Sequence, residues 1–189
     1  MTCLLDIDFL ADDALRGRLA AWSLALLVAP CALIALLVAL GVLPGEGEAD
    51  VLLGGGVLPW VAALAAVTLV SMPVHELVHG ALFCLMGGRG TRVRYGHAAG
   101  MLYAGCPGLV LTRRRFVAVL LGPAVVLGTA LLAVPCALGF ALLGAIAAAL
   151  HLSSCAGDVL ACALALRMPG CTHVQDTERG VRLLAARRG

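Results

Sequence analysis

Four long apolar stretches alternate with shorter polar segments along this chain of 189 residues. They cover about residues 19–43, 57–86, 116–137 and 138–166, and besides three histidines they contain only two ionisable residues other than cysteine and tyrosine, Glu76 and Asp158. Each stretch has at least the roughly 20 residues that a helix needs to cross about 30 Å of hydrocarbon. The pattern predicts an all-α membrane protein with four transmembrane helices, folded as a single membrane domain over residues 1–189.

The polar segments differ in charge. Residues 44–56 carry Glu46, Glu48 and Asp50 and no base, whereas residues 87–115 carry six arginines and no acid. Further arginines precede the first stretch and follow the fourth, in the tail 167–189. By the positive-inside rule, both termini and the arginine-rich loop are expected in the cytoplasm of a multi-pass protein of the plasma (inner) membrane.

Two polar segments leave alternatives open. In the arginine-rich loop, Thr91–Tyr95 and Leu109–Thr112 resemble short strands, so the loop forms either a cytoplasmic hairpin near the functional site or a solvated basic connection. Residues 1–18 form either an amphipathic segment, with Leu4, Leu5, Phe9 and Leu10 on one side, or a loosely ordered tail. The first apolar stretch is too long for a signal peptide and follows an acidic start, so it is expected to stay in the membrane.

Composition supports the membrane assignment. The chain is 62% hydrophobic and 13% charged, whereas soluble domains are about a quarter charged. A net charge of +2 is too small to indicate a nucleic-acid partner. The eight cysteines include no C-x-x-C pair and lie mostly in apolar segments, so they are interpreted as packing residues.

The second apolar stretch contains the candidate chemistry, His75-Glu76-Leu77-Val78-His79. Residues four apart share a helix face, so His75 and His79 can bind one metal ion while Glu76 handles protons. This H-E-x-x-H pattern is typical of two zinc ligands and a general base. Ionisable side chains are costly in a membrane and need partners, which favours a metal site over an accidental set of buried histidines. Pro73 is expected to kink the helix just before the motif.

A third ligand is predicted by depth in the membrane. Asp158 lies eight residues before the end of the fourth stretch, and His79 and His75 lie seven and eleven residues before the end of the second. At 1.5 Å per residue all three lie about 10–16 Å from the same boundary, which predicts a His-His-Asp site. His151 lies about 10 Å further out, too far to share the ion unless the helix is broken, and is assigned a supporting role. Cys155 or Cys162 could replace a ligand or serve only in packing.

These residues resemble a known family. Val74–Gly80 within a span, a basic loop, Gly122-Pro123 in the next span and Gly157-Asp158 in a later one are similar to the membrane zincin peptidases, long catalogued as a domain of unknown function. The resemblance covers about residues 57–166 and extends to the site-2 protease class. It implies an intramembrane zinc metallopeptidase with His75 and His79 as ligands, Glu76 as base, Asp158 as third ligand and Pro123 in support. In most site-2 proteases a glycine follows the metal aspartate, whereas Gly157 precedes Asp158 here.

The predicted function is therefore zinc-dependent hydrolysis of a membrane-protein or membrane-attached peptide substrate near the cytoplasmic side of the bilayer. The alternative is a non-enzymatic protein that binds or transports a metal ion or haem through the same histidines. Glu76 favours the enzyme, because a haem or transport site has no special need for a carboxylate beside His75. Four spans are also few for a transporter, and a catalytically inactive scaffold is a third possibility.

Overall fold

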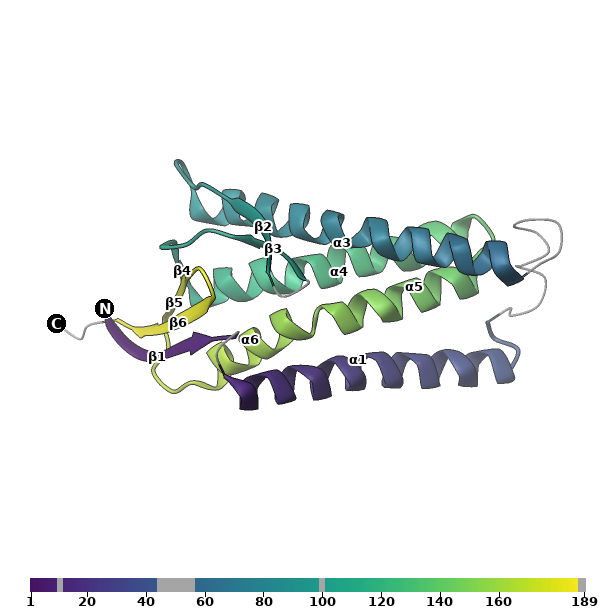
Figure 1. Cartoon of the computed structure of the whole chain (residues 1–189), viewed down its shortest axis with the longest axis horizontal. Helices are drawn as coiled ribbons and strands as arrows, with labels where there is room; N and C mark the ends of the chain where they lie inside the picture. Colours follow the sequence, from purple (N-terminus) through teal and green to yellow (C-terminus); the bar gives the residue numbers. More distant parts are fainter. Residues whose placement is uncertain (10–11, 44–56, 99–100, 187–189) are drawn as a thin grey trace.

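The described residues of the computed structural model, 1–9, 12–43, 57–98 and 101–186, form a helix bundle with a sheet-bearing end. Its helices lie side by side along the long axis of the molecule, and both small sheets lie at one end (Figure 1). We call this end the sheet end. The acidic segment 44–56, predicted as a glycine-rich turn, lies outside the described residues.

Among the described residues, three helices are long and apolar enough to cross a membrane: α1 (Asp13–Ala39), α3 (Val57–Gly87) and α4 (Arg113–Ala137). Helix α1 begins six residues earlier than predicted because the Asp12 carboxylate accepts hydrogen bonds from the Ala14 and Leu15 amides and so caps the helix. Helix α3 runs through Pro73 as one element, so Pro73 does not end the helix before the motif.

The predicted fourth helix is two helices, α5 (Ala141–Ser154) and α6 (Ala156–Arg167), which meet at a bend of 51°. Their length and composition fit a broken span or a re-entrant segment, so three, or up to four if the pair is one span, of the helical segments described here could cross a membrane. The break has a local cause, because three donors compete for the His151 carbonyl: the Ser154 hydroxyl, the Cys155 amide and the Cys155 thiol. Side-chain donors that bond to a helix carbonyl draw the backbone out of its regular ladder.

The prediction of an all-α protein is incomplete, because the polar segments form antiparallel sheets. A four-stranded sheet has the order β1 (Thr2–Asp8), β6 (Gly180–Ala185), β5 (His173–Asp176) and β4 (Val110–Thr112). Its buried side chains Ile7, Val174 and Leu183 join the core around Phe116 of α4. The N-terminal segment is therefore neither an amphipathic surface segment nor a loose tail, but a strand paired with the C-terminal region.

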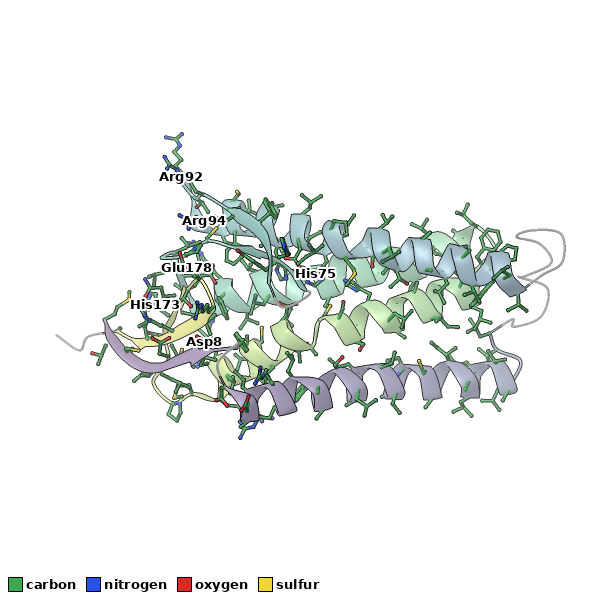
Figure 2. All side chains as sticks on the ribbon, viewed as in Figure 1. Asp8, His75, Arg92, Arg94, His173 and Glu178 are labelled. Atoms are coloured by element: carbon green, nitrogen blue, oxygen red, sulfur yellow. The ribbon has the colours of Figure 1, made fainter. Side chains whose placement is uncertain are left out.

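The arginine-rich loop forms a hairpin of β2 (Arg94–Ala98) and β3 (Met101–Gly105), followed by β4. The predicted strand Leu109–Thr112 corresponds to β4, whereas Thr91–Tyr95 overlaps only the start of β2. Strand β3 packs against α3, so the hairpin lies beside the helix that carries the motif. Figure 2 shows Arg92 projecting away from the bundle at the sheet end. The N-terminal strand, this loop and the C-terminal strands all lie at that end (Figure 1).

Candidate metal centre

Helix α3 turns one face of the H-E-x-x-H motif into the bundle. His75 is 8% exposed and His79 is 4% exposed, whereas Leu77 on the opposite face is exposed. Figure 2 shows His75 within the bundle. Glu76 lies beside this face and is partly buried, and the backbone amide of Ala104 in β3 lies within hydrogen-bonding reach of its carboxylate. The two imidazoles thus face the interior of the bundle, and the Glu76 carboxylate lies beside them, as the motif predicts.

The structure brings Asp158 to these two histidines. His75 Nε2 lies 3.0 Å from His79 Nε2. The two Asp158 carboxylate oxygens lie 3.3 Å from them, Oδ2 from His75 and Oδ1 from His79. Nitrogen and oxygen ligands bound about 2.0–2.1 Å from a tetrahedral zinc ion lie roughly 3.3 Å apart. The spacing of these three side chains therefore fits a zinc ion, and His75, His79 and Asp158 together can hold one.

A second interaction fixes the ring of His79. Its Nδ1 lies 3.2 Å from the carbonyl oxygen of Val119 in α4, so Nδ1–H donates there and the Nε2 lone pair is left available to bind a metal ion. The Val119 carbonyl is free to accept because its usual helical donor would be the amide of residue 123, and Pro123 has none. This contact gives a physical account of the supporting role predicted for Pro123.

The neighbouring Gly122 allows α4 to pack closely on α3. A Cβ atom at this position would lie 2.0 Å from a methyl carbon of Leu82. The Gly122-Pro123 pair therefore does two things at once: it lets the two helices approach, and it frees a carbonyl for His79.

The broken helix brings His151 to the other side of His75. His151 Nε2 lies 3.1 Å from His75 Nδ1, and Cys155 Sγ lies 3.9 Å from the same His75 nitrogen and 3.8 Å from His151 Nε2. The straight-helix estimate that placed His151 about 10 Å from the site was wrong for this reason. These three side chains form a second group that could hold a metal.

His75 belongs to both groups, so the two groups cannot each hold a metal ion at the same time. A neutral imidazole has one lone pair, so His75 cannot offer Nε2 to an ion at Asp158 and Nδ1 to a second ion without losing its last N–H proton. With Nε2 facing Asp158, Nδ1 carries the hydrogen and His151 Nε2 accepts it. His151 then carries its own hydrogen on Nδ1, a buried atom that has no partner among the described residues. His151 is therefore best placed to orient His75.

Sequence reasoning missed the contact between Tyr95 in β2 and Gly80 in α3. A Cβ atom on Gly80 would lie 1.9 Å from the Tyr95 hydroxyl oxygen, so only glycine lets the tyrosine ring approach this part of α3. Gly80 directly follows His79, and a glycine next to the motif was the only sign in the sequence that another element packs against α3 there. The contact brings the β2–β3 hairpin against the motif.

Asp176 in β5 connects the sheet to the loop after the hairpin. Its carboxylate accepts a hydrogen bond from the Cys106 amide, and its backbone bonds to Gly108 and Leu109. Burial raises the pKa of this carboxyl from 3.8 to about 6. The four-stranded sheet therefore contains an acid that is partly protonated near pH 6.

This raised pKa predicts a pH-dependent stability that Asp176→Asn removes. The folded state holds the proton more tightly than the unfolded state, so the free energy of unfolding should fall as the pH rises from about 4 to about 6 and then level off. Two pKa units correspond to at most about 3 kcal/mol, and water at the partly buried carboxyl reduces this. Thermal unfolding of wild type and variant in detergent at pH 5 and pH 8 measures the difference. An equal pH dependence in both proteins would contradict the assignment.

A second prediction concerns Pro123. In Pro123→Ala a new amide competes with His79 for the Val119 carbonyl, so zinc affinity should fall about tenfold, the lower range for losing a partner of a metal ligand. The helix itself should not be destabilised, because a hydrogen bond is restored. Chelator competition and thermal unfolding of the metal-free protein measure these two effects separately. Pro30→Ala in α1, which contributes nothing to the cluster, is the matched control, and equal zinc affinity in both variants would contradict the role.

Two histidines and an aspartate converge beside a glutamate in an apolar helical bundle, and this donor set can hold a zinc ion. Residues 68–172 of the chain, from α3 to the end of the loop after α6, match the family described as "Putative zincin peptidase", and the chain belongs to this family. The matched region includes the motif, Pro123, His151 and Asp158. The predicted zincin resemblance and zinc as cofactor are thereby confirmed. No curated protein and no solved structure matches the chain.

Proposed function

We propose that this protein is a zinc-dependent intramembrane peptidase of the site-2-protease type. The observation that carries the proposal is the convergence of His75, His79 and Asp158 within an apolar bundle, with Glu76 next to them. Helices α1, α3 and α4 are long and apolar enough to cross a membrane, and two of the three ligands project from one of them. A metal site built in this way acts on peptide bonds at membrane depth.

The protein's own groups divide the chemical work. His75, His79 and Asp158 would hold a zinc ion, which would supply a Lewis acid for the peptide carbonyl and for water. Glu76 is free of the ligand set, so its carboxylate accepts a proton and passes it to the leaving amine. The Ala104 amide of β3 lies near that carboxylate. His151 and the Val119 carbonyl hold the two ligand rings by accepting their Nδ1–H groups.

The substrate in this proposal is a membrane protein or a membrane-attached peptide, cut near the cytoplasmic side. Three arginine-bearing segments meet at the sheet end, and the positive-inside rule assigns such segments to the cytoplasm. His79 lies eight residues before the end of α3 at Gly87, about 12 Å from the sheet end. In the plasma (inner) membrane, cleavage at that depth releases a product toward the cytoplasm.

Metal analysis tests the proposal first. We expect about one zinc ion per chain in protein purified in detergent, and none in the double variant His75→Ala/His79→Ala. His97→Ala/His173→Ala, which removes two histidines of the sheet end, is the matched control and should keep the metal. Wild-type zinc content in the His75/His79 double variant would refute the site. Zinc binding with no cleavage of any membrane substrate would instead favour the binding or transport alternative.

A further inference from the structure

A groove lies between α1 and α6 at the sheet end, on the part of the bundle away from α3. It encloses about 370 Å³, within the size range of sites for small ligands. Six residues line it: Arg18, Trp22, Leu160, Ala163, Leu164 and Arg167. The two helices that form it come from opposite halves of the chain and run side by side here (Figure 1).

The groove is positively charged. Its only charged lining residues are Arg18 and Arg167, one from each wall. Two other arginines at this end, Arg16 and Arg182, pair with Asp13 and Asp6. Within the described part of the chain, neither Arg18 nor Arg167 belongs to an ion pair. Two guanidinium groups that face one groove without a carboxylate form a site for an anion, and guanidinium is the group best suited to phosphate.

The groove also changes polarity along the bundle. Arg18 lies in the second turn of α1 and Arg167 is the last residue of α6, so both lie near the sheet end. Trp22 lies one turn further along α1, about 6 Å deeper, where an interfacial aromatic is common. Beyond it, Ala25 and Ala29 lie on the same side of α1 as Trp22 and are exposed, so the apolar surface continues. An anionic group at one end and an apolar surface leading away from it match a phospholipid.

We propose that this groove binds an anionic phospholipid, with the headgroup phosphate between Arg18 and Arg167 and the acyl chains along Trp22 and the apolar side of α1 that follows it. A free phosphate would use the two arginines but would leave the apolar half of the groove without a ligand. A zwitterionic lipid carries an additional cation that the two arginines repel. The site is separate from the metal centre and does not depend on peptidase activity.

Fluorescence quenching of Trp22 by brominated lipids tests this proposal in the full-length protein. The chain has two tryptophans, so Trp60→Phe leaves Trp22 as the single reporter. In vesicles, brominated phosphatidylglycerol should replace phosphatidylcholine at Trp22 with a preference of at least about tenfold. Arg18→Gln and Arg167→Gln should each reduce that preference about fivefold, and together they should abolish it, as expected for about 1 kcal/mol per arginine near an anionic surface.

Three further results decide the outcome. Arg16→Gln removes the same charge from the same helix outside the groove and should keep the preference, whereas an equal loss would show a diffuse surface effect and overturn the site. Arg18→Lys/Arg167→Lys should keep most of the preference, which distinguishes lost charge from a misfolded groove. Displacement of the lipid by millimolar inorganic phosphate would overturn a phospholipid as the occupant. An unchanged preference in the double glutamine variant would also refute the proposal.

Discussion

Replacing Glu76 by glutamine should leave the zinc content near wild type while peptide hydrolysis falls at least a hundredfold, the lower range for losing a general base. Glutamine keeps the size and shape of the side chain and can still meet the Ala104 amide, but it cannot accept a proton. The three metal ligands remain, because Glu76 lies beside the face of α3 that carries His75 and His79 and is not one of the ligands. Cleavage of a transmembrane substrate in reconstituted vesicles and zinc content are measured on the same samples.

Glu178→Gln is the control for this experiment. Glu178 is an exposed carboxylate of the sheet end that pairs with Arg94, so its loss removes a charge without touching the metal centre. Hydrolysis by Glu178→Gln should match wild type. Normal cleavage by Glu76→Gln would show that Glu76 is not the base and that the proposed mechanism fails. Loss of zinc in Glu76→Gln would indicate that the carboxylate supports the metal instead.

The central part of the site could be predicted from the sequence because it depends on local helix geometry. The spacing of His75 and His79 fixes their common face in any α-helix. Asp158 was found by equating its distance from the end of an apolar stretch with that of the histidines. This worked because the helical rise per residue is nearly constant. The segment from Asp158 to the end of α6 is unbroken, so the bend at Cys155 did not disturb that estimate.

The sheet and the bend between α5 and α6 could not be predicted in this way. They depend on contacts between residues far apart in the sequence and on competition for one carbonyl group. Strand β1 finds its partner β6 more than 170 residues away, and neither segment alternates strongly enough to predict the pair. The bend before α6 arises from donors on Ser154 and Cys155, whose effect on a helix depends on rotamer. His151 was misplaced for that reason.

One feature that the sequence analysis missed could have been found there. A proline inside an apolar helix leaves the carbonyl four residues before it without its usual donor, and in a membrane that carbonyl needs another partner. Pro123 therefore identifies the Val119 carbonyl as an acceptor from the sequence alone. The identity of its donor, His79, requires the packing of α4 on α3.

Asp158→Asn should lower zinc affinity by at least about a hundredfold, the upper range for losing a partner of a metal ligand, because Asp158 contacts the ion itself. A neutral amide replaces the anionic ligand that offsets the charge of the ion in a low-dielectric bundle. Cys155→Ser provides the comparison. The Cys155 thiol faces His75 Nδ1, on the opposite side of the ring from Asp158, so its replacement should change zinc affinity less than threefold.

The two variants together decide which side of His75 holds the metal. Chelator competition on purified protein gives both affinities, and a cobalt-substituted sample gives a second readout, because a thiolate ligand adds a charge-transfer band that carboxylate and imidazole do not. The expected result is a large loss for Asp158→Asn, little change for Cys155→Ser and no thiolate band. The reverse pattern would place the ion between His75, His151 and Cys155. His79 and Asp158 would then lie on the metal-free side of His75, and Glu76 would lose its place as the base beside the ligand face.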